Sequence, residues 1–393
     1  MKNVLLRAPL LTNSGYGVHS RQIFEWLMSR KDLNVTTQTL QWGATPWIVN
    51  SDADDGIYRD IMKRSSNIDK KFDITFQVQL PDEWDTSLGR FNVGVTALVE
   101  TDRCNSAWMQ KLIDINLIIV PSRFTKGVIL KTFGSSFDRK VKVIPEWFNP
   151  HLVSDETTLS RVRDERYYFD TNFNLMTIGT LTSPVANCDR KNLVNTIGWA
   201  IEALEGEANT GIIVKTCLGK GSVADREMTK SAVAQIVSMF RKSHFPRVHL
   251  IHGNMTSLEV ASLFRSGRVQ GYISATRGEG YGLPLIEAAA SGIPIIATGW
   301  SGHLDFLKDS FLKVDYDLVN IPNEKIDNRI FIQGTRWAEP KKDSYIENIR
   351  YLIENYKKQT AISKKLKKNI THLYSREKIF KKYNEFIKEN FDL

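Results

Sequence analysis

Two glutamates frame a glycine-rich segment in the last third of the chain. Glu279 stands in the sequence RGEGYGLP (277–284), and Glu287 follows within the apolar stretch LIEAAA (285–290). Three glycines in five residues let the backbone approach a ligand closely, and Pro284 suits the first turn of a helix whose free amides attract an anion. A carboxylate in an apolar helix must be paired or hydrogen-bonded, because burying it bare costs several kcal/mol. Sugar or ribose hydroxyls would satisfy Glu287, and so would a neighbouring loop that it caps.

A basic pair, Arg190-Lys191, follows the first strand predicted for the second half of the chain. A guanidinium beside an ammonium can hold a phosphate through charge-assisted hydrogen bonds, and the two can equally be a solvated pair at the start of a helix. Lys215, after another predicted strand, is as compatible with a buried stem and a surface ammonium as with a role at the site. The glycine loop Gly15-Tyr16-Gly17 is weak evidence alone, because Ser20 stands where a dinucleotide fingerprint has its third glycine.

Two series of short apolar strands, alternating with helices, must position these residues. In the first half of the chain we predict strands at 4–6, 73–76, 93–96, 117–120 and 141–144, and a helix over 21–29. In the second half we predict strands at 175–178, 211–214, 248–251, 271–273 and 293–296. The polar stretch from Pro150 to Asn172 separates the two series. From Lys342 to Asn390 the pattern is helical throughout.

This alternation predicts an α/β protein of two Rossmann-like domains, each with a parallel sheet covered by helices. Residues 1–155 form the predicted N-terminal domain and residues 170–375 the C-terminal domain, in line with two domains for 393 residues. Ligands of such sheets bind at the carboxyl ends of the strands, so we expect the active site in the cleft between the domains.

An apolar stripe near the end of the chain needs a surface to pack on. Its members recur at helical spacing: Ile379, Phe380, Tyr383, Phe386 and Ile387. The sheet of the C-terminal domain should already be covered by its own helices. We therefore expect residues 376–393 to dock on the N-terminal domain.

Composition excludes several classes of protein. The chain is 42% apolar and 25% charged, as in soluble globular proteins, and has no run of 18 apolar residues that would span a membrane. The apolar start at 4–6 is too short for a signal peptide. Cys104, Cys188 and Cys217 are odd in number and far apart, which is typical of reduced cysteines in a cytoplasmic protein.

The net charge of +9 is concentrated at the C-terminal end. Residues 341–393 hold 14 Lys and Arg against 7 Asp and Glu, a net charge of +7. A basic helical end can face an anionic membrane, a nucleic acid or a charged acceptor, and it can equally be a solvated helix face. The sequence leaves these alternatives open, including a peripheral place at a membrane.

The segment EGYGLPLIEA (279–288) strongly resembles the signature of retaining glycosyltransferases of the large family that includes sucrose and glycogen synthases (family 4-like, group 1). The resemblance implies the GT-B fold, with two Rossmann-like domains facing across a cleft and a final helix that crosses back to the N-terminal domain. It extends over essentially the whole chain. The other similar segments are 15–17, 96–103, Trp108, 120–124, 189–192, 301–305 and 337–340.

The resemblance also implies roles for individual residues. Glu279 would face the hydroxyls of the donor sugar, Glu287 would bind the nucleotide ribose, and Arg190 and Lys191 would hold the diphosphate. The implied catalytic set is thus Glu279, Arg190 and Lys191, with no metal ligand. The further donor contacts that it implies are Gly15, Gly17, Gly280, Tyr281, Gly282 and Leu283.

One departure from the family concerns the reaction centre. Many relatives have a histidine after the strand at 73–76, where this chain has QVQLP (77–81). Glu100 or Asp102 is the candidate to line the reaction centre instead. His252 is expected near the nucleotide base, and a structural histidine is nearly as compatible with the pattern.

The function that these observations predict is transfer of a hexosyl group from a nucleotide sugar, such as a UDP- or GDP-hexose, to an acceptor hydroxyl, with retention and without a further cofactor. The acceptor stays open between a glycan, a lipid-linked sugar, a protein and a hydroxymethylated DNA base. Three alternatives remain: a nucleotide-sugar epimerase of the same fold, a transferase acting on modified DNA bases, and a non-catalytic binding module.

Overall fold

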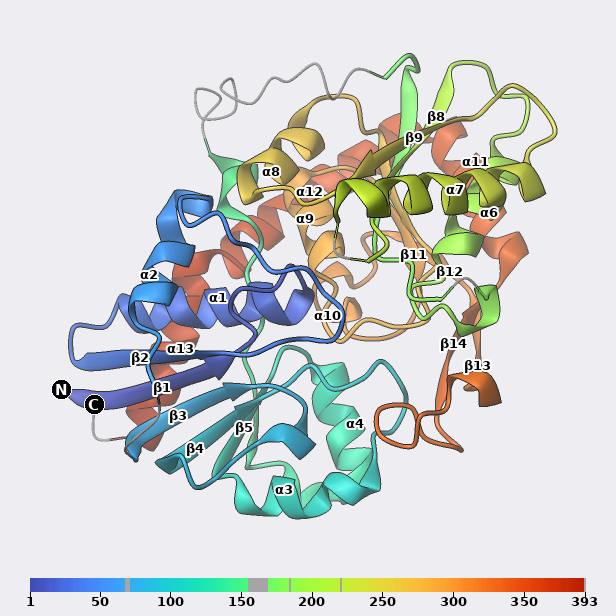
Figure 1. Cartoon of the computed structure of the whole chain (residues 1–393). Coiled ribbons are helices and arrows are strands. Elements are labelled where there is room, and N and C mark those ends of the chain that lie inside the picture. The colour runs from blue at the N-terminus through green and yellow to red at the C-terminus, as the bar shows by residue number, and fades with distance from the viewer. Residues whose placement is uncertain (68–70, 155–168, 184, 220, 392–393) are drawn as a thin grey trace. The chain divides into compact units, whose positions relative to one another are not determined.

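The computed structural model describes residues 1–67, 71–154, 169–183, 185–219 and 221–391 (Figure 1). The chain divides into two compact units, and each is described here by itself. Unit 1 comprises Met1–Trp147 and Tyr374–Leu393, and unit 2 comprises Phe148–Leu373. Most of the polar stretch predicted to connect two domains, residues 155–168, lies outside the described residues.

Unit 1 is built on a six-stranded parallel sheet in the order β2-β1-β3-β4-β5-β6. Its strands are β1 (Lys2–Ala8), β2 (Leu33–Thr39), β3 (Phe72–Val78), β4 (Gly89–Val95), β5 (Leu117–Val120) and β6 (Val141–Val143). Its helices are α1 (Gly15–Met28), α2 (Ile57–Lys63), α3 (Met109–Asp114), α4 (Arg123–Phe133) and α13 (Arg376–Asn390). Five of these strands were predicted. The sequence pattern missed β2, whose residues LNVTTQT are largely polar because the strand lies at the edge of the sheet.

The glycine segment at 15–17 is the first turn of α1, so the prediction of a loop there, with a helix only from Arg21, was wrong. Ser14 caps the helix, and its hydroxyl accepts a hydrogen bond from the Gly17 amide at 3.0 Å. A Cβ at position 17 would lie 2.1 Å from the Thr12 carbonyl oxygen, so only glycine fits there. Close backbone packing is therefore sufficient to explain Gly17.

Helix α13 completes the core of unit 1, which confirms the predicted docking of the C-terminal helix. Figure 1 shows α13 beside α1, and the Trp26 and Tyr383 rings stack there with their centroids 4.7 Å apart. The Trp26 indole donates a hydrogen bond to the Asn384 side chain at 2.9 Å. The predicted stripe supplies four buried residues to the core: Ile379, Tyr383, Phe386 and Ile387.

Unit 2 contains a second six-stranded parallel sheet, in the order β12-β11-β10-β7-β8-β9. Its strands are β7 (Phe173–Ile178), β8 (Thr210–Thr216), β9 (Arg247–His252), β10 (Gly271–Ser274), β11 (Ile295–Thr298) and β12 (Leu312–Val314). Its helices are α6 (Leu193–Ala203), α7 (Val223–Phe240), α8 (Ser257–Arg265), α9 (Leu283–Ser291), α10 (Leu304–Leu307), α11 (Lys342–Glu354) and α12 (Tyr356–Leu373). The two parallel sheets confirm the predicted α/β class.

Unit 2 also has an antiparallel hairpin, β13 (Tyr316–Asn320) and β14 (Arg336–Pro340), which the sequence pattern did not predict. These strands pair with each other and not with the main sheet. Trp337 of β14 is fully buried. The hairpin therefore packs against the body of unit 2 through the side chains of β14.

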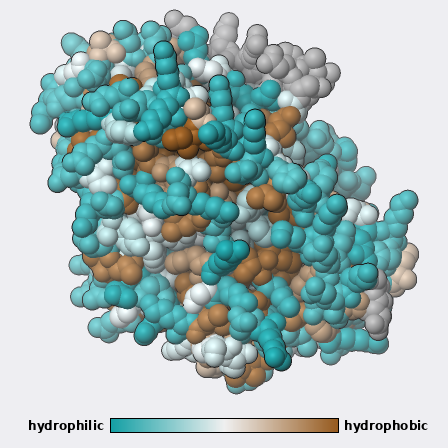
Figure 2. Space-filling model, turned by 180° about the vertical axis from the view of Figure 1, so that it is seen from behind, coloured by the Kyte–Doolittle hydropathy of each residue, from teal (hydrophilic) through white to brown (hydrophobic). Residues whose placement is uncertain are grey.

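The surface face in Figure 2 is mainly hydrophilic, with hydrophobic residues in small patches. Helix α12 carries exposed lysines and no acidic residue. These lysines are Lys357, Lys358, Lys364, Lys365 and Lys368. Across the described part of the chain, none of the helices is both long and apolar enough to cross a membrane.

Replacing Tyr383 with Ala should destabilise unit 1 by about 3 kcal/mol or more, because it removes a buried ring that stacks on Trp26. Urea denaturation followed by tryptophan fluorescence would measure the change. The exposed neighbour Lys382 provides a control, since its replacement with Ala should change stability by less than about 0.5 kcal/mol. Equal midpoints for Tyr383→Ala and the wild type would show that α13 is only an appendage.

Candidate active site

The glycine-rich segment forms the turn between β10 and α9, as its sequence predicts. Gly282 is the N-cap of α9 in a left-handed conformation (φ 102°), and Gly292 ends the helix at φ 81°. Non-glycine residues rarely adopt these angles, so both glycines are needed to start and stop the helix. Helix α9 begins at Leu283, where the helix dipole polarises its end positively, and the Leu285 and Ile286 amides of the first turn donate to the Gly282 carbonyl oxygen.

The structure brings together two of the residues predicted to be catalytic. The ammonium of Lys191 lies 2.6 Å from each carboxylate oxygen of Glu279, and the Thr276 hydroxyl lies 3.2 Å from one of them. Burial raises the pKa of the Glu279 carboxyl, but the charges of Lys191 and Arg190 outweigh this effect and hold the pKa below its ordinary value. Glu279 is therefore ionised at neutral pH and paired with a cation.

The parallel pairing of β7 with β10 explains why these residues meet. The two strands are neighbours in the sheet, with Leu175 opposite Gly271. Parallel neighbours end at the same edge, so the loop after β7 and the loop after β10 lie together. The first loop carries Lys191 and the second carries Glu279.

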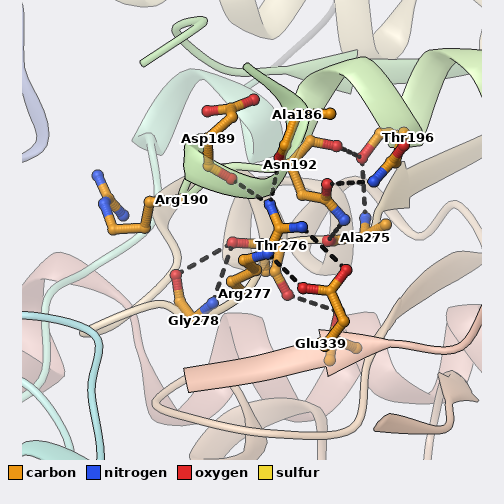
Figure 3. Close-up of polar contacts among 12 residues, drawn as sticks. Ala186, Asp189, Arg190, Asn192, Thr196, Ala275, Thr276, Arg277, Gly278 and Glu339 are labelled. Carbon is orange, nitrogen blue, oxygen red and sulfur yellow. Dashed lines mark hydrogen bonds and ion pairs between the residues drawn. The ribbon is translucent and has the colours of Figure 1, made fainter. Parts of the chain in front are cut away.

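Buried polar contacts shape the loop that carries Arg190 and Lys191. The Asp189 carboxylate accepts hydrogen bonds from the Thr182 hydroxyl at 2.5 Å and from the Leu193 amide at 2.6 Å. Asn192 adopts a left-handed conformation, and its side chain donates to the Ala275 carbonyl oxygen at 2.9 Å. Figure 3 shows the Arg190 side chain directed away from this group of contacts.

Glu287 lies on α9 and is half-buried, and among the described residues it does not cap a neighbouring loop, which was one of the two partners that the sequence analysis left open. No side-chain hydrogen bond or ion pair is formed by Glu287 with the residues that the structure describes. Burial raises its pKa to about 8. A pKa above neutrality favours the protonated carboxyl, which costs less than a carboxylate in these apolar surroundings.

His303 is a site residue that the sequence analysis did not single out. It is fully buried beside the loop of Glu279, and its Nε2 lies 2.8 Å from the Thr298 carbonyl oxygen. Burial lowers the pKa of the ring, so it is neutral, and Nε2 must donate to the carbonyl. Nδ1 is then an acceptor, and among the described residues no donor reaches it. The only sequence signal was the resemblance of SGHLD (301–305) to the family.

The segment before His303 also shapes the glycine turn. The Gly302 amide donates to the Glu279 carbonyl oxygen at 2.8 Å, and a Cβ at position 302 would lie 2.1 Å from the Gly280 carbonyl oxygen. The Ser301 hydroxyl accepts a hydrogen bond from the Glu279 amide at 2.8 Å. The main chain of Glu279 is therefore fixed from the side of β11.

Four of the predicted residues belong to unit 1: Gly15, Gly17, Glu100 and Asp102. The Tyr16 hydroxyl, between Gly15 and Gly17, lies 3.0 Å from the Thr96 hydroxyl and accepts from the Ala97 amide at 3.0 Å. Glu100 is partly exposed. Asp102 is buried and pairs with Lys131 at 2.8 Å, so a structural role is sufficient to explain it. Gly15 is exposed at the start of α1.

Two further features bear on ligands. His252 lines a cavity of about 770 Å³ between α7 and β9, together with the basic residues Arg226, Lys230 and Arg241. In the described ranges no three His, Cys, Asp or Glu side chains gather as metal ligands do.

No family model matches the sequence, and no curated protein matches it. Solved structures match nearly the whole chain. Sucrose-phosphate synthase of Thermosynechococcus elongatus is 12% identical, with 99% of each chain covered and a TM-score of 0.63. HepE of Anabaena, in complex with UDP-glucose, is 11% identical over 99% of this chain and 100% of that one, with a TM-score of 0.65. A glycosyltransferase of Rickettsia africae is 12% identical over 99% and 98%, with a TM-score of 0.65. This likeness confirms the predicted GT-B fold.

Replacing Glu287 with Gln should remove a pH-dependent loss of stability. The pKa of the carboxyl is about 8 in the folded protein against an ordinary value of 4.5, so the folded state binds the proton more tightly than the unfolded chain does. The free energy of unfolding of the wild type therefore falls as the pH rises from about 5 to about 8. In urea titrations over this range, we expect the wild type to lose about 1–3 kcal/mol more than the Gln variant.

The exposed Glu227 on α7 offers a matched control, since Glu227→Gln should keep the wild-type pH dependence. If Glu287→Gln also kept that slope, the pKa of the Glu287 carboxyl would not be raised in the folded protein, and another group would cause the pH dependence.

Proposed function

We propose that this chain is a retaining glycosyltransferase that moves a hexosyl group from a nucleotide-diphosphate sugar to an acceptor hydroxyl. The observation that carries the proposal is the Lys191–Glu279 pair beside the N-terminus of α9. Glu287 lies about one turn into that helix. This arrangement combines groups for an anion with groups for hydroxyls. The GT-B fold and the likeness to a sucrose-phosphate synthase and to a protein solved with UDP-glucose support the same reaction class.

The diphosphate would bind where positive charge is concentrated. Lys191, Arg190 and the positive end of the α9 dipole can stabilise the charge that develops as the bond between the sugar C1 and the phosphate oxygen breaks. Lys191 is already within hydrogen-bond distance of Glu279, so a phosphate oxygen would share its ammonium with the carboxylate. These groups supply the charge stabilisation that a divalent metal gives in other transferases, and we propose that the reaction needs no metal.

The ionised Glu279 would accept hydrogen bonds from hydroxyls of the donor sugar and orient its C1. The neutral His303 offers a second acceptor, Nδ1, beside Glu279. In the proposed reaction the acceptor oxygen bonds to C1 on the face that the phosphate leaves, and the departing phosphate oxygen takes the acceptor's proton. Configuration is retained without a covalent enzyme intermediate.

Glu287 would bind the ribose of the nucleotide. A protonated carboxyl can donate one hydrogen bond to a ribose hydroxyl and accept another, whereas an ionised one accepts only. The Gln variant keeps one donor and acceptor pair, so it should bind nucleotides better than an Ala variant does.

The product belongs, in this proposal, to glycan or glycoconjugate synthesis in the cytoplasm. The three cysteines form no disulfide, which agrees with the reducing compartment that this proposal assumes. The exposed lysines of α12 could attract an anionic acceptor or a membrane surface that carries one.

The test of the proposal is a panel of UDP- and GDP-sugars added to the full-length protein. We expect calorimetry to show binding of one nucleotide class and slow release of free sugar from one donor, undiminished by a chelator. Glu287→Ala should weaken nucleotide binding about tenfold while the protein stays folded. Conversion of a donor to its epimer, with no release of nucleotide, would favour the epimerase. Turnover lost in chelator and restored by magnesium would contradict metal independence.

Replacing both Arg190 and Lys191 with Ala should lower turnover by about 100-fold or more, on the scale of lost transition-state charge stabilisation. The basic pair Lys341-Lys342 at the start of α11 is a matched control, because it forms ion pairs with Asp317 and Glu202 instead. Its double Ala variant should keep more than about half of the wild-type turnover. Similar rates for both double variants would remove Arg190 and Lys191 from the reaction.

A further inference from the structure

Arg277 is a deeply buried arginine beside the candidate site, and the proposed mechanism gives it no role. Only 1% of its side chain is exposed, although it lies in the turn that carries Glu279. Its backbone amide donates to the Arg190 carbonyl oxygen at 3.0 Å, and its carbonyl oxygen accepts from the Ala338 amide at 3.1 Å. The main chain at Arg277 thus joins the loop after β7 to strand β14.

The guanidinium repeats this connection with stronger bonds (Figure 3). Nη1 donates to the carbonyl oxygens of Ala186 at 2.7 Å and Asp189 at 2.6 Å. Nε and Nη2 donate to the two carboxylate oxygens of Glu339 at 2.6 and 2.9 Å. The guanidinium also lies over the Trp337 ring, 5.4 Å from its centroid.

These contacts act at the main chain that carries the proposed catalytic cations. The Asp189 carbonyl belongs to the peptide bond that leads into Arg190, so a shift of the guanidinium moves that peptide. Glu279 follows Arg277 by two residues in the chain, and its carboxylate binds the Lys191 ammonium. The backbone segments that carry Lys191 and Glu279 are therefore both positioned by the buried Arg277 guanidinium and its own main chain.

Glu339 is what permits a permanent charge at this depth. An arginine side chain cannot lose its proton in a protein, so a buried guanidinium needs a counter-ion and satisfied donors. The bidentate geometry fixes the plane of the guanidinium as well as its charge. The carboxylate comes from the β13–β14 hairpin, and 36% of it is exposed. The hairpin thereby fixes the orientation of the Arg277 guanidinium.

We infer that Arg277, held by Glu339, is a positioning residue that fixes the backbone of Arg190 and Lys191 at the distance from Glu279 that donor turnover requires. The inference deepens the proposed function and rests on it, because donor turnover is itself part of that proposal. The physical reason is that a small misplacement of a charged group costs far more in rate than in binding, because the transition state depends more steeply on geometry.

The main test is Arg277→Lys, which keeps the charge but loses the planar fork. We expect kcat per folded molecule to fall about 10- to 100-fold, with KM for the donor changed less than about threefold. Arg265→Lys is the matched control, because Arg265 also donates to two loop carbonyls, those of His151 and Ser154, and lies outside the candidate site. It should leave kcat within about twofold of the wild type.

A double-mutant cycle tests whether Arg277 acts through the cations. When Arg190 and Lys191 are both Ala, adding Arg277→Lys should lower the remaining rate less than about threefold. An equal loss in both backgrounds would overturn the inference, and so would an unchanged kcat in Arg277→Lys. A fall in activity that matches the fall in folded protein would leave only a structural role and would also overturn it.

Hydrogen exchange gives a reading that needs no activity. In Arg277→Lys, amides of residues 186–192 should exchange about tenfold faster than in the wild type, while Arg265→Lys leaves them unchanged. Glu339→Gln, at a partly exposed position that is less apt to prevent folding, should shift exchange and kcat in the same direction. If the wild type turned over no donor, the proposed function would fail. Unchanged hydrogen exchange in both Arg277→Lys and Glu339→Gln would separately overturn the positioning role of Arg277.

Discussion

The parallel pairing of β7 with β10 is the constraint on which the candidate site depends. It places two loops at one edge of the sheet although 88 positions separate Lys191 from Glu279 in sequence. Each loop is irregular and would be free to move alone. Side chains that cross between them convert neighbouring loops into a fixed arrangement: Asn192 reaches Ala275, Lys191 reaches Glu279, and Arg277 reaches Asp189.

Three ionisable groups are accommodated in three different ways within this small region. Glu279 stays ionised because Lys191 and Arg190 lie beside it. Glu287 has no such neighbour among the described residues, and burial keeps it protonated. Arg277 cannot change its protonation, and a bidentate carboxylate balances it. The region thus holds polar groups that suit a ligand with an anionic group and hydroxyl groups, and protein contacts or protonation stabilise them in place of water.

Unit 1 shows the same dependence on distant segments. Its core is finished by a helix from the other end of the chain, since Trp26 of α1 packs both on Phe76 of β3 and on Tyr383 of α13. Tyr383 supplies both an aromatic face to Trp26 and a hydroxyl 3.3 Å from His19. Helix α13 therefore belongs to unit 1 for the ordinary reason that apolar area must be buried.

The sequence by itself determined most strands and the glycine turn of α9, because these follow from local patterns of apolar residues and glycine. The family resemblance predicted Glu279, Arg190 and Lys191 for the site, and the structure brings Lys191 to Glu279. The sequence could not determine the edge strand β2 or the β13–β14 hairpin, whose residues are largely polar and lie outside the buried sheet centre. It did not single out His303 or Arg277 within the segments 301–305 and 277–284. Their importance lies in contacts with Thr298, Asp189 and Glu339, and only the tertiary structure decides which distant carbonyl or carboxylate a buried side chain meets.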